Sequence, residues 1–231
     1  MSDLFPSTHA TWLLTQLDAN PDAARAHVMS RYFEPLCAYV RASRLRQFGD
    51  PADIVNDFLA ARVGDASYLA RWRTSGLPLR RWLANGLLLH TRNAALATRR
   101  RAEHGGSTSN DELERAAFTT RASDHETDAL LALERTWAVR TVTEAHERIR
   151  TELGAEGRGA WWELFRLHTI NGMSYAQACS IVGTPLTSAS SVHRTVVDRL
   201  RVALRTILER DGIRPEDIDS ELAAMQDFLE S

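Results

Sequence analysis

The chain has 231 residues, of which 44% are hydrophobic and 25% charged, and this balance favours folded globular domains, two of them at this length. No apolar run approaches the roughly 18 residues of a membrane-spanning helix, and no basic leader precedes an apolar core, so the sequence predicts a cytoplasmic protein without a signal peptide or membrane segment. The net charge of −2 argues against strong non-specific binding of nucleic acid by the whole chain.

Helical periodicity dominates the sequence, and no segment alternates as a strand does. The predicted fold is all-α, with two small helical domains joined by a flexible linker. We place the domains at residues 1–102 and 127–212, the linker at 103–126 and an acidic tail or short helix at 213–231. The predicted helices are 8–18, 22–47, 51–63, 78–102, 127–153, 159–170, 174–182 and 187–210, with a short one possible at 215–229.

The segment DPADIVNDFLAARV (50–63) predicts a helix with one acidic side. Asp50 and Pro51 suit its N-cap and first turn. Asp50, Asp53 and Asp57 follow one side, whereas the opposite side is apolar. A solvated acidic face and a partner-binding face are both open interpretations. A metal site is weaker, because no His or further carboxylate cluster joins the three aspartates.

The segment 77–102, LPLRRWLANGLLLHTRNAALATRRRA, predicts a basic helix. Its buried stripe is expected to consist of Trp82, Leu83, Leu87, Leu88 and Leu96. Its other positions carry Arg80, Arg81, Asn85, Arg92, Asn93, Arg99, Arg100 and Arg101. Arginines and amides among aromatic rings suit single-stranded or melted DNA. Core packing is favoured over base contact for Trp82.

Residues 174–201, SYAQACSIVGTPLTSASSVHRTVVDRLR, predict two helices joined by a short turn. The first presents an apolar face, Gly183-Thr184-Pro185 breaks it, and the second buries Ala189, Val192, Val196, Leu200 and Leu204. Such a pair predicts a helix-turn-helix that binds duplex DNA, with an ordinary helical hairpin as the alternative. The outward candidates for DNA contact are Thr187, Ser188, Ser190, Ser191, Arg194, Thr195 and Arg201.

Charge is distributed in blocks along the chain. All 28 basic residues are arginine, so any phosphate contact is a guanidinium contact. Residues 62–102 carry nine arginines and one acid, whereas residues 209–231 carry two arginines and eight acids. Residues 103–163 are also acidic. The blocks predict separate polyanion-binding surfaces, which the acidic linker and tail shield in the free protein.

Four motifs in order resemble a bacterial RNA polymerase sigma factor of the extracytoplasmic-function group of the sigma-70 family, with regions two and four only. RYFEPLCAYVR (31–41) is similar to the opening helix of that family, and DPADIVNDFLAARV to its polymerase-docking helix. The segment from Leu79 to Asn93 with the following TRRR resembles the helix that reads the minus-ten element. Residues 174–201 resemble region four, and the resemblance covers roughly 22–102 and 127–210.

The resemblance implies a transcription-initiation subunit with core RNA polymerase, through its clamp coiled coil and flap, and promoter DNA as partners. An anti-sigma factor or another regulator is a further candidate partner. No catalytic residue, metal or cofactor is implied. The polymerase-binding residues would be Asp50, Asp53, Asn56, Asp57 and Arg62. The basic helix would hold the melted minus-ten strand, and the second helix of the 174–201 pair would read the minus-thirty-five duplex.

Some positions depart from the family pattern. Asn56 stands where the family prefers Gln, and Ser190 stands where it has a basic residue, so one phosphate contact is missing. Three alternatives remain open: a stand-alone helix-turn-helix regulator that binds duplex DNA as a dimer, a polymerase-docking adaptor that does not direct initiation, and a helical enzyme. No phosphate-cradling loop or nucleophile motif favours the enzyme.

Overall fold

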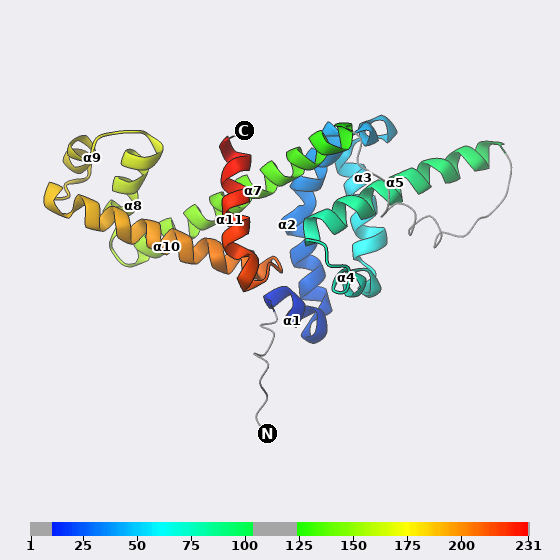
Figure 1. The fold of residues 1–231 in the computed structure, drawn as a ribbon, viewed down its shortest axis with the longest axis horizontal. Coiled ribbons are helices and arrows are strands. Elements are labelled where there is room, and N and C mark those ends of the chain that lie inside the picture. The colour runs from blue at the N-terminus through cyan, green and yellow to red at the C-terminus, as the bar shows by residue number, and fades with distance from the viewer. Residues whose placement is uncertain (1–10, 104–123, 231) are drawn as a thin grey trace, which may run out of the picture. The chain divides into compact units, whose positions relative to one another are not determined.

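The computed structural model describes residues 11–103 and 124–230, and within these ranges every regular element is helical (Figure 1). The all-α prediction is therefore confirmed. None of the helices in these ranges is both long and apolar enough to cross a membrane. The predicted linker falls mostly in 104–123, outside the described residues.

The chain divides into two compact units. The first comprises residues 1–138 and 209–231, and the second comprises 139–208. The N-terminal part of the chain thus groups with residues 127–138 and 209–231. The sequence-based division differs, because it assigns 127–138 and 209–212 to the C-terminal domain. The reason is the set of buried contacts described below, which no local pattern in the sequence signals.

The first unit begins with four helical elements that surround a core of aliphatic and aromatic side chains. Val28, Tyr32 and Leu36 of the second helix and Phe58 of the third are all at most 2% exposed. Asn20 caps the second helix with a side-chain bond to Ala23 N, and a proline occupies its first turn. These elements are α1 (Trp12–Ala19), α2 (Pro21–Ala42), η1 (Arg44–Phe48) and α3 (Pro51–Phe58).

The chain continues into elements that complete the first unit. Helix α4, which the sequence reading missed, is only seven residues long and is capped by Asp65. In the predicted apolar stripe of α5, Trp82, Leu83 and Leu87 are buried. Leu96 is 43% exposed, because it lines a surface groove. The elements are η2 (Leu59–Val63), α4 (Ala66–Trp72), α5 (Leu79–Glu103), the start of α7 (Asp124–Ala155), η5 (Pro215–Asp217) and α11 (Ile218–Glu230).

The second unit has a core built from long and short helices. Ala145, Ile149 and Leu153 of α7 pack with Val196 and Leu200 in one buried cluster. A neighbouring cluster joins Leu164, Cys179, Ala189 and Val192. The remaining elements are α8 (Gly159–Phe165), η3 (Arg166–Ile170), α9 (Tyr175–Val182), η4 (Leu186–Ser188) and α10 (Ala189–Arg210).

Candidate functional site

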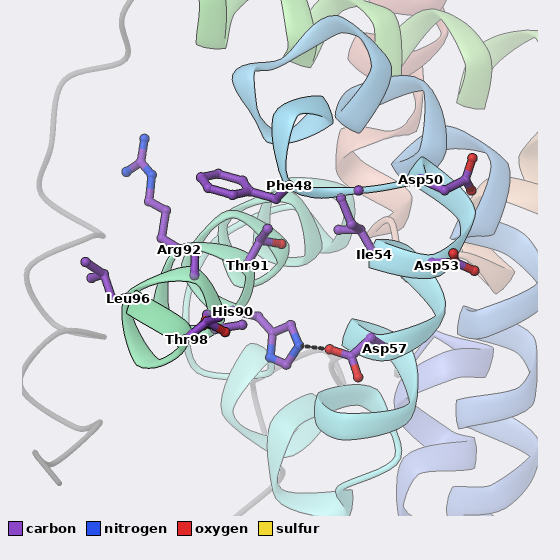
Figure 2. A pocket seen from close by; sticks show the side chains of 13 residues that line it. Phe48, Asp50, Asp53, Ile54, Asp57, His90, Thr91, Arg92, Leu96 and Thr98 are labelled. Atoms are coloured by element: carbon purple, nitrogen blue, oxygen red, sulfur yellow. Dashed lines mark hydrogen bonds and ion pairs between the residues drawn. The ribbon is translucent and has the colours of Figure 1, made fainter. Parts of the chain in front are cut away.

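A groove lies between α3 and α5, with three aspartates on its α3 side and Arg92 on its α5 side (Figure 2). Asp50 is the N-cap of α3, where its Oδ1 accepts a hydrogen bond from Ala52 N at 2.8 Å. Asp53 and Asp57 follow at the spacing of one helix face, and all three aspartates are exposed and line the groove. The groove has a volume of about 1040 Å³. The acidic side of the predicted helix therefore borders a concave surface.

Apolar side chains line the same groove. Phe48, at the end of η1, is 46% exposed, and Leu96 of α5 is 43% exposed. Ile54 of α3 is half-buried between the aspartates. In Figure 2, Leu96 lies on α5, Asp57 points toward His90, and the carboxylates of Asp50 and Asp53 point away from α5. A surface that combines carboxylates with exposed apolar groups can take an amphipathic segment that carries arginine or lysine.

His90 joins the two walls of the groove. Its Nε2 lies 2.8 Å from Asp57 Oδ2 (Figure 2). Its ring is tilted against that of Phe58 at a centroid distance of 5.9 Å. The Asp57 carboxylate is still 71% exposed, so a cation from solvent has access to it. Neither Phe48 nor His90 was a predicted site residue, because only the tertiary fold brings them to Asp57.

The other predicted polymerase-binding residues lie outside this lining. Asn56 is exposed on α3, and Arg62 is half-buried in the short π-helix η2. Neither borders the groove. The structure thus brings three of the five residues together, and it adds α5 as the opposite wall.

The arginines at the start of α5 are engaged by carboxylates. Arg80 is only 7% exposed; its Nε donates to Glu134, and its Nη2 donates to Glu221 Oε1 at 2.6 Å. Arg81 Nε lies 3.2 Å from the second oxygen of Glu134. Burial lowers the pKa of Arg80, but the charges of Glu134 and Glu221 more than offset burial and raise the pKa above its usual value. Arg80 is therefore a buried cation in this conformation.

The remaining candidates on α5 differ in exposure. Asn85 and Asn93 are half-buried, and Arg92 is exposed with its Nη2 3.2 Å from Glu126 Oε1. Arg99, Arg100 and Arg101 belong to the last turns of the helix, and their side chains lie outside the described residues. Trp82 is 9% exposed and its packing role is confirmed. Tyr68 and Trp72 of α4 are also buried, each at 6% exposure, so neither ring is open to a base.

Helices α9 and α10 of the second unit are joined by a turn whose ends are set by capping. Ser174 and Gln177 form a capping box at the start of α9. Gly183 ends the helix in the left-handed conformation at φ 71°, which a glycine adopts without steric cost. Val192 and Val196 are buried as predicted. The two helices and their break therefore follow the sequence pattern.

The predicted contact residues on α10 form an outward polar strip. Ser190, Ser191 and Arg194 are exposed, and the Arg201 side chain is 69% exposed beside Asp198. Thr187 is exposed, and Ser188 and Thr195 are half-buried. Hydroxyls of this strip donate to helix carbonyls, as Thr195 Oγ1 does to Ser191 O at 2.9 Å. The hydroxyl oxygens keep acceptor capacity, and the arginines supply the positive charge.

A group of aromatic and histidine rings underlies this strip. His193, one turn along α10, bonds through Nε2 to Thr169 Oγ1 at 2.9 Å, and its ring lies 5.6 Å from that of Phe165. His168 stacks on Tyr175 with centroids 3.8 Å apart. Burial, and then the charge of His168, lowers the pKa of His193. Burial likewise lowers the pKa of His146, which packs against Trp162.

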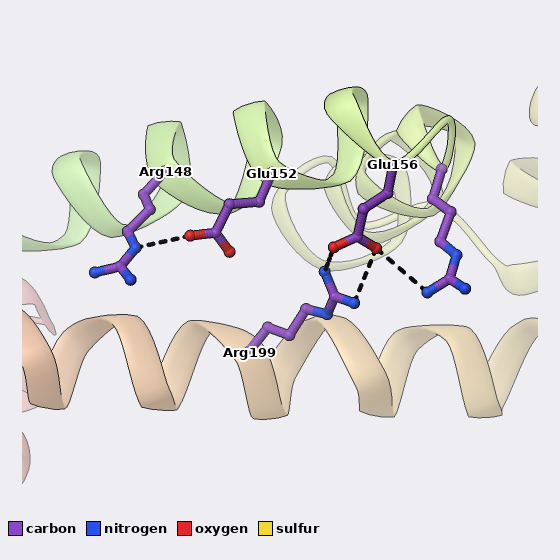
Figure 3. Close-up of polar contacts among 5 residues, drawn as sticks. Arg148, Glu152, Glu156 and Arg199 are labelled. Carbon is purple, nitrogen blue, oxygen red and sulfur yellow. Dashed lines mark hydrogen bonds and ion pairs between the residues drawn. The ribbon is translucent and has the colours of Figure 1, made fainter.

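An ion-pair group connects α7 to α10 within the second unit (Figure 3). Nη1 and Nη2 of Arg199 donate to Glu156, at 2.7 and 3.0 Å, and Arg158 Nη1 lies 3.3 Å from the same carboxylate. The hydrogen bond from Arg199 is the main reason that the pKa of Glu156 is lowered. Arg199 was not a predicted contact residue, and its guanidinium is bonded to Glu156 rather than belonging to the outward strip.

Comparison of the chain with protein-family models, with curated proteins and with solved structures gives no match. The described residues contain no group of three or more His, Cys, Asp or Glu side chains placed to hold a metal ion.

Proposed function

We propose that this protein is a sigma factor that binds core RNA polymerase and directs promoter recognition, DNA melting and transcription initiation. The observation that carries the proposal is the order of four motifs along the chain, from RYFEPLCAYVR to the 174–201 pair. The groove at Asp50, Asp53 and Asp57 supports it, because its carboxylates and exposed apolar groups match an arginine-rich coiled coil.

In this proposal each unit has its own task. The groove docks on the clamp of the polymerase, and the arginines of α5 hold the melted minus-ten strand by phosphate contacts and by stacking of guanidinium planes on bases. The outward strip of α10 reads the minus-thirty-five duplex, with Arg194 as its principal cation. The polymerase supplies the chemistry of RNA synthesis, so this chain needs no catalytic residue.

Docking is tested by charge reversal in the groove. Asp57→Arg places a cation where the partner's cations would lie, and it should weaken binding of core polymerase by about ten- to a hundredfold. Asp128→Arg is the matched control, because Asp128 is exposed on α7 and does not line the groove. Binding is measured with purified full-length protein and core polymerase by biolayer interferometry.

Promoter recognition is tested by run-off transcription on the DNA upstream of the protein's own gene. Wild-type protein with core polymerase should yield a defined start, Asp57→Arg should not, and Asp128→Arg should behave as wild type. Polymerase binding without any start would favour the adaptor. A palindromic footprint of the protein alone, without polymerase, would favour the dimeric regulator.

A further inference from the structure

The first arginines of α5 lie against acidic side chains from distant parts of the chain. Arg80 contacts Glu134 of α7 and Glu221 of α11, which are 54 and 141 residues further along the chain. Arg81 shares Glu134, and Arg92 pairs with Glu126. All of these residues belong to the first unit. Three arginines proposed to hold a DNA strand thus each face a carboxylate of the same chain.

The surroundings of Arg80 match those that a nucleic-acid strand offers to an arginine. Its guanidinium carbon lies 4.5 Å from the centre of the Trp137 ring, and two carboxylates occupy its donors. A single strand offers a flat base for stacking and anionic phosphate oxygens for the same donors. The internal groups and a strand therefore compete for one guanidinium.

The acidic C-terminal segment, residues 209–230, is anchored by three buried residues along its length. Asp211 is buried and binds Arg31 of α2, and Ile218 and Met225 are at most 2% exposed. Between these anchors lies a cavity of about 320 Å³, bordered by Trp72, Asp217 and Glu221 among others. The segment is thus held by buried apolar side chains at Ile218 and Met225 and, between them, by the ion pair of Glu221 with Arg80, and this ion pair is the contact that can exchange for another anion.

We propose that the C-terminal segment, together with Glu134, is an autoinhibitory contact that occupies the α5 arginines and excludes nucleic acid from the free protein. The inference rests on the proposed function, because it assigns the regulation of the same arginine surface. A strand presented by the polymerase complex displaces Glu221 from Arg80, and the segment moves away from α5. The net charges of residues 62–102 and 209–231, opposite in sign, agree with this competition.

The test removes the negative charge of Glu221 without changing its size. Glu221→Gln leaves Arg80 short of a counter-ion while buried, which destabilises the closed form. We expect the full-length variant to bind a fluorescein-labelled single-stranded DNA at least about fivefold more tightly than wild type in fluorescence anisotropy. Glu216→Gln is the control, because Glu216 is 65% exposed and lies 4.0 Å from Arg214. It should bind as wild type does.

Two further variants keep the test decisive. Met225→Asp buries a charge under α11 and releases the segment without touching a partner of Arg80, so it should show the same gain. Adding Arg80→Ala to Glu221→Gln should remove the gain. Hydrogen exchange over residues 215–230 reports release, and far-UV circular dichroism reports that the fold is kept.

The outcomes separate this inference from the proposed function. If exchange of the segment rises in both single variants and DNA affinity stays at the wild-type value, the autoinhibitory contact is refuted. It is equally refuted if neither exchange nor affinity changes. If the wild type fails to bind core polymerase while Glu221→Gln gains DNA affinity, the sigma-factor proposal fails and the contact with a nucleic-acid surface stands.

Discussion

Arg31 and Asp211, 180 residues apart in the chain, form a buried ion pair in which Arg31 Nε donates to Asp211 Oδ2 at 2.7 Å. The same carboxylate accepts a bond from Trp137 Nε1 at 3.2 Å and lies 3.0 Å from His27 Nε2. Burial raises the pKa of Asp211, but the hydrogen bond with His27 and the charge of Arg31 more than offset it and lower the pKa. Asp211 therefore stays ionised and joins α2, α7 and the end of α10.

Neutralising Asp211 should destabilise the first unit. Asp211→Asn preserves the shape of the side chain but removes the buried carboxylate that pairs with Arg31, which costs about 3 kcal/mol or more. The measurement is the free energy of unfolding from urea titration followed by tryptophan fluorescence. Asp217→Asn, at an exposed position of η5, should stay within about 0.5 kcal/mol of wild type. Equal urea midpoints for the two variants would contradict the role of Asp211.

Close packing of α5 against α4 makes Gly86 sensitive to any side chain. A Cβ at Gly86 would overlap the Tyr68 hydroxyl and approach Phe58 Cε2 to 3.2 Å. Gly86→Ala should therefore destabilise the protein by about 1–3 kcal/mol. Tyr68→Phe in the same chain removes the overlapping oxygen and should recover part of the loss. Gly154→Ala, on α7 with open space around it, should be neutral or slightly stabilising. Thermal unfolding followed by circular dichroism measures the stability of all three variants.

Local patterns predicted the helices well because their causes are local. Apolar periodicity and capping residues such as Asp50, Ser174 and Gly183 act within a few positions of the chain, and the structure places helix ends at or beside them. The break between α2 and η1 was missed, because the sequence there lacks glycine or proline. Helix α4 was not predicted, because seven residues are too few to show a helical period of apolar residues.

The same local patterns could not predict the roles of residues whose contacts come from far along the sequence. The sequence pattern places Arg80 on the polar side of α5. In the structure Arg80 is buried, and its guanidinium binds Glu134 and Glu221, which are far along the chain. The acidic side of the groove followed from the spacing of Asp50, Asp53 and Asp57. Its apolar wall did not, because only the packing of α5 brings Leu96 near α3. Helix pattern specifies which residues face outward, and tertiary contacts decide which of them remain available.

Mild acid should destabilise the second unit. The folded-state pKa values of His146 and His193 are lowered, so the unfolded chain binds protons at a higher pH than the folded one. Stability contributed by the neutral rings is thus present above about pH 6.5 and declines as the pH falls through that value. The urea midpoint of the second unit should therefore be lower at pH 5.5 than at pH 7.5, because this range spans the ordinary pKa of histidine.

Replacing both rings checks the source of this decline. His146→Gln combined with His193→Gln should flatten the pH dependence even if it lowers stability at neutral pH, since neither glutamine titrates. His27, in the first unit, is the comparison site: His27→Gln should leave the decline in the second unit in place when amide exchange over residues 139–208 is followed. An unchanged slope in the double variant would assign the pH response to other groups.

Restoring a cation at Ser190 should strengthen duplex binding through α10. Ser190 is exposed in the first turn of α10, where a lysine side chain can reach a backbone phosphate if the outward strip faces DNA. Each added phosphate contact steepens the dependence of log K on log salt by about 0.9. Ser190→Lys should therefore increase the magnitude of this slope by about 0.9, and Arg194→Ala should decrease it by about the same amount. Thr143→Lys adds the same charge at an exposed position of α7 and should leave the slope unchanged. Filter binding of a labelled duplex over a salt series measures all three, and equal slopes for the two lysine variants would place the DNA surface elsewhere than on α10.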